Sequence, residues 1–551
     1  MSKLFGWTPV NQFVAGLGAV TGLFALTTLI LASVNVHLAM NPKYPTPMAS
    51  VPCPAQDHAD LRRIQSYNLR VSKATENAAK TIPCQTPNGD EAFYASKVGS
   101  FTKGLQHNAM GEVDPGQFAQ FVHAIENNAY SQMPRSAGAE RRYVNPQASV
   151  TFDLIGGDSH SFYQPAAPAF NSTEQGGEYV EVAWMAVLRD IPFADYSGNA
   201  LAIMASAELN TFGSNFTGPT PVTEDNLFRG QQPGCWVGPY LAQFFYKPIQ
   251  YGYHDFQMKI DPHAPAVDFM TNYGEFLNIQ NGLNPSGSEQ LLGPPRYMIN
   301  GRDLANWVHV DVIWQAYHMA TLSLFTMEAP YNPTNPYLTS LNQEGFATFG
   351  AADVVTKVSE VATHALHAVW NQKWRVHRRQ RPEAFGGRVH VHKTMGATYP
   401  IDASALNSMA NSIFFAQHSS YLLPQAYPEG SPMHPSYGAG HATVAGACVT
   451  VLKAFFDGSW VIPDPVEPSP DGSALLPLAQ NLTVQGELDK LANNIALGRN
   501  IAGVHWRTDG TESLAMGEQV AIEFLRDYKN TYSERFTGWS FVNFEGRRVN
   551  I

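Results

Sequence analysis

The chain has 551 residues, of which 44% are hydrophobic and only 15% charged, so it can bury a large core. Its net charge of −11 argues against a nucleic-acid binder, because no basic stripe would offset repulsion by phosphates. The four cysteines form no Cys-x-x-Cys metal pattern. Cys53 and Cys84 flank a Pro-rich segment and could form a disulfide in an oxidising compartment.

The N-terminal region contains a long uncharged segment. Residues 13–39 contain no Asp, Glu, Lys or Arg, and the stretch AGLGAVTGLFALTTLILASV is long enough to span a bilayer. No clean small-x-small cleavage site follows it, so residues 1–40 are interpreted as an uncleaved anchor rather than a removed signal peptide or a buried soluble helix. Either export signal predicts an exported protein, periplasmic or extracellular, and the anchor would tether it through residues 10–39. The Pro-rich stretch 41–58 is typical of a linker.

From residue 59 to 551 the apolar residues recur mainly at helical spacing. The helix candidates, in chain order, are 177–191, 303–325, 352–374, 489–506 and 511–528. Segment 303–325 is apolar almost all round, which predicts a single central helix. Long Gly/Pro-rich loops, such as 213–240 and 280–296, separate the helices, and the C-terminal FTGWSFVNFEGRRVNI could form a short hairpin. The prediction is a mainly α fold: a large helical bundle with long loops and minor β-hairpins.

Three separated segments have the chemical character of an oxyanion pocket. They are KWRVHRRQRPE (373–383), HPSYGAGH (434–441) and RNIAGVHWRTD (499–509). Lys373 would lie at the end of a long helix that Pro382 stops. The Gly440-His441 pair would begin a buried helix, where free N–H groups and the positive end of the helix dipole favour an anion. Forked arginine donors, a lysine, backbone N–H groups and flanking imidazoles are what a tetrahedral oxyanion requires.

The combined pattern is Lys-x(7)-Arg-Pro, then Gly-His, then Arg-x(3)-Gly-x-His. It resembles the pattern of the vanadium-dependent haloperoxidases, which share their oxyanion pocket with the type 2 phosphatidic acid phosphatases. The seven-residue gap, and the histidine seven residues before that of the Gly-His pair, resemble the algal-type bromoperoxidase branch. Further segments similar to that branch are 101–115, 143–159, 181–196 and 301–312. The resemblance covers about 60–551 and implies that the vanadate site lies within about 300–530.

The resemblance assigns cofactor roles to five residues. His505 would bind vanadium axially through a ring nitrogen, as the one metal ligand from the protein. Lys373, Arg381 and Arg499 would neutralise the vanadate oxygens, with help from the Gly440 backbone N–H. The resemblance implies vanadate as the cofactor without haem, and it allows a structural calcium ion in addition.

Four residues receive roles on the catalytic side of the pocket. His441 would contact the opposite apical oxygen and act as general base toward hydrogen peroxide. Lys373 would then polarise the peroxide, which makes one oxygen electrophilic toward halide. His434 would lie at the halide-facing position, with Trp370 beside the pocket one helical turn before Lys373.

Three further positions are weaker assignments. Asp311 is expected to be a buried partner for an arginine such as Arg499. Asp509 could either cap the helix that starts near it or orient His505, and the sequence leaves both possibilities open. Ala439 stands where many members of the family have serine, so the chain lacks one hydroxyl donor to an equatorial oxygen. Losing one hydrogen bond to a charged group costs about 1.5–3 kcal/mol, so vanadate is expected to bind less tightly.

Other ionisable residues near these motifs are interpreted without a role in the site. Most single basic residues lie on protein surfaces, and the residues expected to be surface charge are His377, Arg375, Arg378, Arg379 and Arg388. Several histidines lie among apolar neighbours of predicted helices. Those expected to be packed or capped core residues rather than ligands are His309, His318, His364 and His367.

The leading functional hypothesis is an enzyme, a peroxidase that oxidises bromide or iodide with hydrogen peroxide to hypohalous acid, which halogenates small organic acceptors. Family resemblance also implies a homo-oligomer. One alternative is an acid phosphatase of the same superfamily, in which His505 would be the nucleophile; a lipid phosphatase of this kind would usually need several membrane helices. The other is a non-catalytic envelope protein that keeps the scaffold, and only Ala439 favours it.

Overall fold

The computed structural model describes residues 56–551. The predicted anchor and Cys53, and with it the disulfide to Cys84, lie outside the described residues. The linker was predicted to end at residue 58. Helix α2 (Gln56–Ala79) already begins at Gln56, so the predicted C-terminal end of the linker was wrong. Chain contacts divide the protein after Arg70, which leaves the second unit, residues 71–551, with all other described elements.

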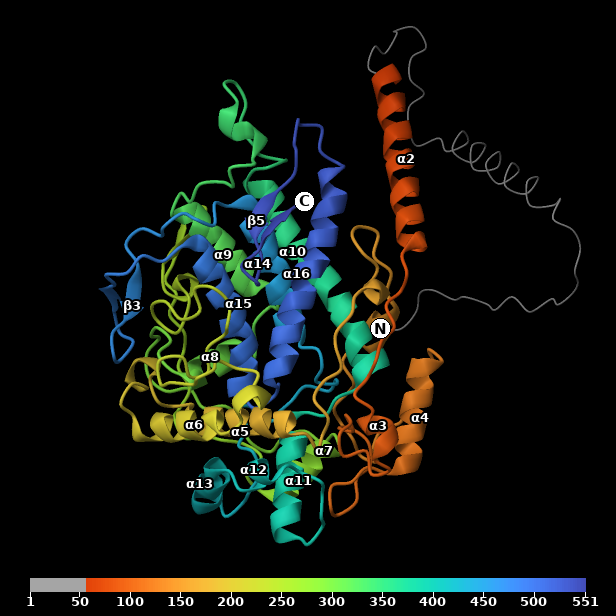
Figure 1. Cartoon of the computed structure of the whole chain (residues 1–551), viewed down its shortest axis with the longest axis vertical. Helices are drawn as coiled ribbons and strands as arrows, with labels where there is room; N and C mark the ends of the chain where they lie inside the picture. Colours follow the sequence, from red (N-terminus) through yellow and green to blue (C-terminus); the bar gives the residue numbers. More distant parts are fainter. Residues whose placement is uncertain (1–55) are drawn as a thin grey trace, which may run out of the picture. The chain divides into compact units, whose positions relative to one another are not determined.

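Four helices form the centre of the second unit: α10 (Ala351–Asn371), α14 (Gly440–Phe455), α15 (Val484–Ile501) and α16 (Arg507–Lys529). Helix α14 packs against the other three, as Figure 1 shows. Every residue of α14 except His441 is buried, because its sequence is mainly Ala, Val and Gly and its one lysine, Lys453, is paired with Asp489. The core of the molecule therefore surrounds the helix that begins at the Gly440-His441 pair.

Two glycines let α14 and α16 approach closely. A Cβ atom added at Gly446 would collide with the Leu514 carbonyl, and one added at Gly517 would collide with that of Thr443. This close contact fixes the start of α14 beside the start of α16. The N-terminal ends of two buried helices thereby meet in one region.

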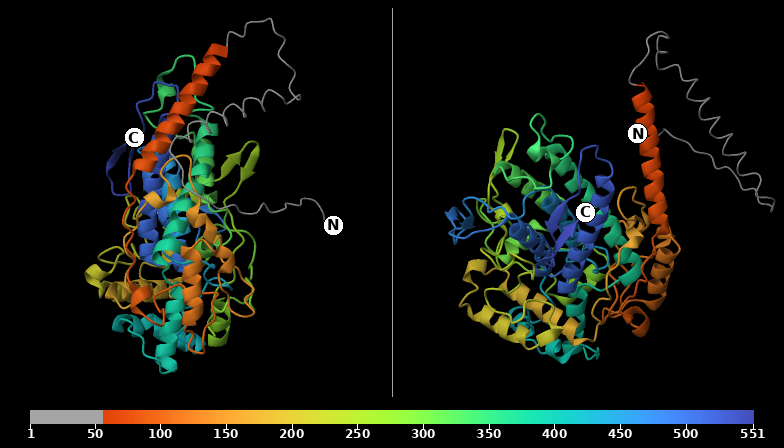
Figure 2. Two further views of the ribbon diagram at one scale, coloured as in Figure 1. Left: turned by 90° about the vertical axis from the view of Figure 1, so that its right-hand side faces the viewer. Right: turned by 45° about the horizontal axis from the view of Figure 1, so that its top comes forward.

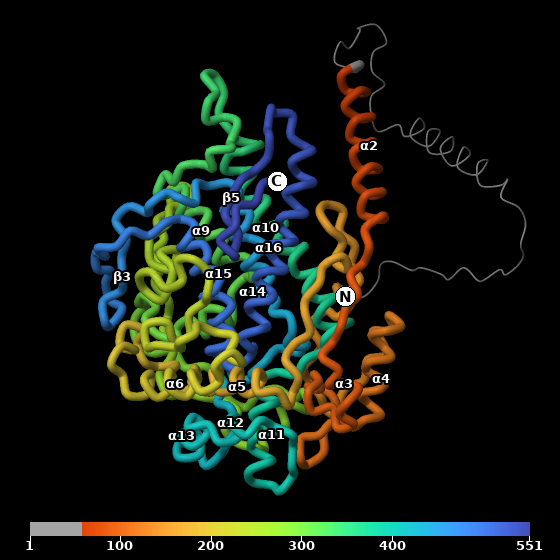
Figure 3. The backbone as a smooth tube through the Cα atoms, in the orientation of Figure 1, coloured from red at the N-terminus to blue at the C-terminus, as the bar shows by residue number. Residues whose placement is uncertain are grey.

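The remaining helices surround this centre, and the tube drawing in Figure 3 shows α11, α12 and α13 together beyond α5 and α6. They are α3 (Asp90–Phe93), α4 (Pro115–Glu126), α5 (Thr173–Leu188), α6 (Ala200–Asn210), α7 (Tyr273–Gln280), α8 (Gly301–Trp307), α9 (Gln315–Thr326), α11 (Pro382–Thr394), α12 (Ala403–Leu406) and α13 (Met409–His418). Seven short 3-10 turns are η1 (Tyr130–Gln132), η2 (Pro146–Val150), η3 (Ser159–Ser161), η4 (Phe193–Asp195), η5 (Gly213–Asn215), η6 (Gln243–Phe245) and η7 (Pro336–Thr339).

Three antiparallel hairpins are the β structure of residues 56–551, so the mainly α prediction is confirmed. They are β1 (Ile249–Tyr251) with β2 (His254–Phe256), β3 (Val466–Pro468) with β4 (Leu475–Pro477), and β5 (Ser540–Val542) with β6 (Arg548–Asn550). The last pair is the hairpin predicted at the C-terminus. Its register joins Phe541 to Val549.

The prediction of one helix over 303–325 was wrong. Helix α8 ends at Trp307 and α9 begins at Gln315, with a loop between them. The Val308 N–H closes α8 on the Leu304 carbonyl, and the next polar side chains, His309 and Asp311, find partners away from the helix axis. A purely apolar pattern cannot reveal this interruption, because the reason for it lies in other segments.

Two boundaries near the motifs also differ from the prediction. Segment 489–506 is not helical to its end: α15 stops at Ile501, and Gly503 adopts φ +86° in the connection to α16. Pro382 does not stop the helix that contains Lys373 but begins α11, a position that suits proline because its missing N–H is not needed there. Among residues 56–551, no helix has both the length and the apolar character needed to cross a bilayer.

Candidate vanadate site

Three buried cations converge from three elements. Lys373 lies in a π-helical turn, η8 (Gln372–His377), that continues α10; such turns are frequent at functional sites. Arg381 is the residue just before α11, and Arg499 lies in the last turn of α15. The exposed fractions of these three residues are 0%, 2% and 5%. The sequence motifs therefore meet in one place, as predicted.

None of these three cations has a carboxylate within 4 Å among the described residues. Instead they donate to neutral oxygens. Lys373 Nζ donates to the carbonyls of Pro435 (2.9 Å) and Ser436 (2.8 Å). Arg381 donates to the carbonyls of His434 and Val504.

Arg499 completes this group of cations. Its Nη1 donates to the Val308 carbonyl (2.7 Å) and to the Tyr427 hydroxyl (3.2 Å), while its buried Nε has no partner among the described residues. Buried charges are ordinarily paired. Lys373, Arg381 and Arg499 have no carboxylate partner, and Arg499 Nε is a free donor. This arrangement fits an oxyanion bound between the three cations.

The pKa values of Lys373 and Arg381 are lowered because both groups are buried close to other cations. Burial lowers the pKa of Lys373 well below its usual value, and the nearby Arg381 lowers it further. Burial, opposed by Asp509 and reinforced by Arg499, lowers the pKa of Arg381 to about 9. A bound anion would relieve this mutual repulsion, so the residues present fit vanadate.

His505 lies in the connection between α15 and α16 with one ring nitrogen fixed and the other facing the cations. Its Nδ1 is 2.8 Å from Asp509 Oδ2, and its Nε2 is 2.9 Å from Arg381 Nη1. Burial, with the charges of Arg381 and Lys373, lowers the pKa of His505 well below 6.5, so the ring is neutral. Its proton must then be on Nδ1, so Nε2, which accepts from Arg381, is the ring nitrogen whose lone pair could bind a metal.

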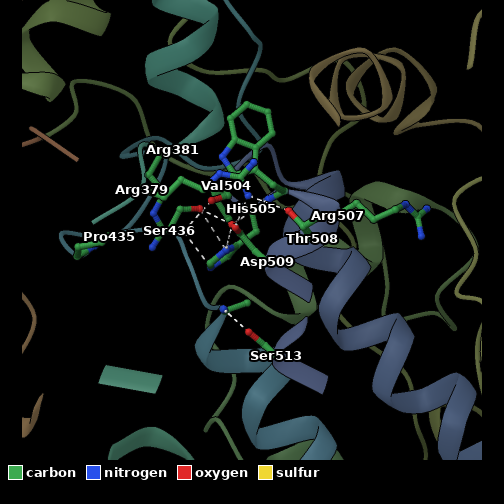
Figure 4. Close-up of polar contacts among 12 residues, drawn as sticks. Arg379, Arg381, Pro435, Ser436, Val504, His505, Arg507, Thr508, Asp509 and Ser513 are labelled. Carbon is green, nitrogen blue, oxygen red and sulfur yellow. Dashed lines mark hydrogen bonds and ion pairs between the residues drawn. The ribbon is translucent and has the colours of Figure 1, made fainter. Parts of the chain in front are cut away.

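Asp509 performs both of the roles that the sequence left open. Its Oδ2 accepts from His505 Nδ1 and also from the Trp506 backbone N–H (3.1 Å) at the start of α16. The Ser436 hydroxyl, fully buried, donates to the same oxygen. Figure 4 shows these groups gathered around the Asp509 carboxylate. The Asp509 carboxylate thus both caps helix α16 and orients the His505 ring.

Arg379 was predicted to be surface charge, and this was wrong. It is 2% exposed, and its guanidinium contacts Asp509 Oδ1 (2.8 Å) and Glu178 Oε2 (2.5 Å). It also donates to Thr508 Oγ1 and Gln175 Oε1. Glu178 lies on α5, far from the motifs in the sequence, so nothing local indicated a partner. This arginine joins α5 to the carboxylate that orients His505.

Three of its neighbours were also expected on the surface and are buried: His377, Arg378 and Arg388. Arg378 is paired with Glu91, and Arg388 donates to the carbonyls of Met110 and Gly111. Arg375 is partly buried and donates to the Ile125 carbonyl. Buried partners supplied by residues 91–125 explain why this basic stretch is not a solvated face.

The remaining histidines mostly pair with carboxylates rather than packing in the core. His309 lies between Glu289 (2.6 Å) and Glu429 (2.8 Å). His364 and His367 both point at Asp153. His318 is half-buried with no partner for Nδ1 in the described chain. None of them faces the cations of the site.

His441 opens α14 and pairs with Asp311. The distance between His441 Nε2 and Asp311 Oδ1 is 2.8 Å. The predicted pairing of Asp311 with Arg499 was therefore wrong, because the loop that interrupts 303–325 carries the carboxylate to His441 instead. Burial raises the pKa of Asp311, but His441 and Arg499 outweigh it and lower that pKa. Asp311 thereby orients the His441 imidazole at the first turn of α14.

The start of α14 has no side-chain cap. Ala439 occupies the cap position and cannot accept from the first N–H groups, so the Gly440 amide lies in a buried, uncapped first turn. The free N–H groups of a buried, uncapped helix start favour an anion. The Ala439 N–H itself donates to Ser513 Oγ (2.8 Å), which places a serine hydroxyl beside this position. A Cβ at Gly440 would come within 3.2 Å of the Trp370 ring, a contact that would require the ring to shift slightly.

His434 and Trp370 lie together beside Lys373. Their rings are 5.0 Å apart, and the Lys373 ammonium lies 5.9 Å from the Trp370 ring. His434 also contacts the cations directly, because Arg381 Nη2 is 2.9 Å from its Nδ1. Burial, then the charges of Lys373 and Arg381, lower the pKa of His434 well below 6.5. His434 therefore adjoins the anion pocket more closely than the sequence indicated.

The residues that sequence reasoning missed are Ser436, Arg379, Glu178, Val504 and Tyr427. Ser436 and Arg379 stand inside the quoted motifs, so attention to every polar residue there could have found them. Glu178 and Tyr427 had no sequence pattern that would identify them. The calcium ion stays a prediction: across residues 56–551 no group of three or more His, Cys, Asp or Glu is arranged to hold a metal ion.

Comparisons with known proteins identify the family of the chain. The model of the VCPO second helical-bundle domain matches residues 354–534. A vanadium-dependent bromoperoxidase of Corallina officinalis is 35% identical, over 90% of this chain and 99% of its own length. One of Ascophyllum nodosum is 33% identical, over 91% and 95%.

A solved structure shows the same fold. It is the homohexameric second vanadate-dependent bromoperoxidase of Ascophyllum nodosum, with a TM-score of 0.85 and 30% identity over 93% of this chain and 95% of that one. Matches of this length and identity establish the family. The chain belongs to the algal-type vanadium-dependent bromoperoxidases and is a vanadate-dependent haloperoxidase.

Proposed function

We propose that the protein oxidises bromide and iodide with hydrogen peroxide to hypohalous acid, and chloride poorly. The observation that supports it is His505 Nε2, which contacts Arg381 within a group of three buried cations that have no carboxylate partner. The hypohalous acid halogenates small organic acceptors. Bound vanadate supplies the activation that makes a peroxide oxygen electrophilic, without a change in the oxidation state of vanadium.

The residues of the chain divide the remaining work. His505 Nε2 would hold the metal while Asp509 fixes the ring. Lys373, Arg381 and Arg499 would bind the vanadate oxygens as charge-assisted donors. His441, held by Asp311, would accept a proton from incoming hydrogen peroxide and return it to the product.

Family membership favours this reaction over the two alternatives. Phosphate would fit the same cations, and His505 Nε2 could attack it, but the matching relatives are bromoperoxidases over nearly the whole chain. The missing hydroxyl at Ala439 weakens the site without removing any cation. The proposal also includes export to the periplasm or exterior, with residues 10–39 as the tether, and a homo-oligomer, since one relative is homohexameric.

The first test concerns the cofactor. Protein stripped of metals and dialysed against phosphate should have no bromide-oxidising activity, and orthovanadate should restore it, because both anions compete for the same cations. Bromination of phenol red during a vanadate titration at several phosphate concentrations measures this competition. Full activity of the stripped protein in phosphate would contradict the assignment of the pocket.

A second prediction concerns halide choice. His434→Phe replaces an imidazole that touches Arg381 with an apolar ring beside Trp370, so the polarity of the halide region should fall. We expect the ratio of chloride to bromide turnover to change severalfold. Vanadate affinity should change by less than about tenfold, because Arg381 keeps its carbonyl partners and the three cations remain.

Steady-state rates with each halide, and a vanadate titration of each protein, test this prediction. Leu341→Phe, at a fully exposed position outside the site, is the control for adding a phenyl ring. An unchanged halide ratio in His434→Phe would show that this residue does not face the halide. A loss of vanadate binding as large as that of His505→Ala would show that it serves the cofactor instead.

A further inference from the structure

A cavity of about 860 Å³ adjoins the catalytic pair, and none of the roles above uses it. Asp311, whose carboxylate holds His441, is one of its lining residues. The other walls come from the β1–β2 hairpin, α8, α9 and the loop between these helices. The hairpin projects from the helical body in the left view of Figure 2, in yellow-green. Asp311 thus contacts both the cavity and His441, the proposed general base.

The lining is mainly apolar and runs from a buried floor to an exposed rim. The floor residues are buried: Phe245, Ile249, Met258 and Met298. The rim carries Tyr251, Leu291 and Val310, whose exposed fractions are 55%, 64% and 79%. Large apolar side chains exposed together mark a binding surface. The volume is typical of a site for a small organic molecule.

Three polar atoms of the lining have no partner in the described chain. They are Asn306 Oδ1, on a residue only 6% exposed, His318 Nδ1 and His263 Nδ1; the other ring nitrogen of His263 lies 3.4 Å from Glu289 Oε2. Burial lowers the pKa of His318, so its ring is neutral. Unsatisfied buried polar groups are rare and call for a partner. A hydroxyl group can donate to Asn306 Oδ1, which belongs to the most buried of these three residues, so the cavity offers an apolar body with a hydrogen-bonding point at its buried end.

The charges of the lining select a neutral occupant. Asp311 and Glu289 are each paired with a histidine, and the cavity carries no arginine. Lys259 faces the nearby Tyr297 ring, and Asp261 lies exposed at the rim. An anion would meet one exposed ammonium, that of Lys259, but would lie near the carboxylates of Asp311, Glu289 and Asp261.

We infer that this cavity binds the organic halogen acceptor, a neutral, mainly apolar molecule with one hydroxyl group and an electron-rich ring. The inference rests on the proposed function, which supplies hypobromous acid close by. The ring carbon attacks bromine, the bromine–oxygen bond breaks with its electron pair on oxygen, and the ring proton joins the departing hydroxide. Hypobromous acid and the acceptor thereby yield the brominated ring and water.

The test uses two naphthols with the same reactive ring. 2-Naphthol is neutral and apolar, and 6-hydroxynaphthalene-2-sulfonate carries a charge that the cavity should exclude. Asn306→Leu removes the unpartnered oxygen, and Met319→Trp fills the cavity from α9. Leu341→Trp, fully exposed and outside the lining, is the control for adding an indole. All proteins are used as full-length holoenzymes.

We expect the KM for 2-naphthol to rise at least fivefold in Asn306→Leu and Met319→Trp but not in Leu341→Trp. The sulfonate should react at equal rates with all four proteins, and peroxide-dependent oxidation of iodide to triiodide should be unchanged. Quenching of 2-naphthol fluorescence by the protein without peroxide should show saturable binding that both cavity variants weaken.

Equal 2-naphthol kinetics and binding in all proteins would overturn the inference, because hypobromous acid would then react only in free solution. An altered oligomer mass in Met319→Trp, with unchanged naphthol binding, would also overturn it and assign the groove to contact between copies. If wild-type protein oxidises no halide, the proposed function fails. In that case the quenching of 2-naphthol fluorescence still shows whether 2-naphthol binds in the cavity.

Discussion

His505→Ala is expected to lower vanadate affinity by more than about 100-fold and to abolish halide oxidation. Changes to groups that merely orient a metal ligand cost 10–100-fold, and this change removes the ligand itself. The three cations would still attract the anion but could not hold it covalently. In the wild type, His505 Nε2 also accepts a hydrogen bond from Arg381 Nη1. The variant removes this acceptor from Arg381.

The measurement is vanadium retained after gel filtration, alongside a vanadate titration. His441→Ala is the matched control, because it removes an imidazole from the same pocket without removing the metal ligand. That control should keep most of its vanadium and lose most of its turnover. Equal vanadium content in the two variants would show that the histidine roles have been assigned wrongly.

Arg379→Met is expected to destabilise the protein by about 3–5 kcal/mol, the usual effect of removing one partner from a buried charge pair. It leaves Glu178, 1% exposed, and Asp509, 0% exposed, without their shared cation. Vanadate affinity should fall about 10–100-fold as well, because Asp509 would no longer be held against His505 Nδ1. Denaturant unfolding and the vanadate titration measure the two effects separately.

The pH dependence of this variant has a definite sign. In the wild type, burial raises the pKa of Glu178 although Arg379 opposes it. Loss of Arg379 raises that pKa further, and a carboxyl whose folded pKa is raised loses stability as pH rises through it. The deficit of Arg379→Met should therefore be largest above that pKa and shrink as pH falls.

Two further variants make the test decisive. Arg375→Met, six residues before Arg381 and only partly buried, should cost no more than about 1 kcal/mol, because its main partners are a carbonyl and an amide. Adding Glu178→Gln to Arg379→Met should recover part of the stability. A stable Arg379→Met protein with unchanged vanadate affinity would show that this ion-pair chain is not needed to orient His505.

The sequence by itself predicted which residues would meet at the candidate anion site, because an oxyanion needs several cations and an imidazole and the three motifs supply them. Lys373, Arg381 and Arg499 do converge, although the helix ends beside Arg381 and His505 differ from the prediction. The mainly helical fold followed from the 3.6-residue period, which records which face of each helix is buried. The C-terminal hairpin followed in the same way from local pattern.

Only the tertiary structure decided how those residues are supported. Arg379 looked like surface charge because its partner Glu178 lies about 200 residues away on α5. Asp311 was assigned to Arg499 because the interruption between α8 and α9, which carries it to His441, is invisible in an apolar run. Burial of a charge and the choice of its partner depend on which distant segments the fold brings into contact. A local pattern carries no record of those contacts.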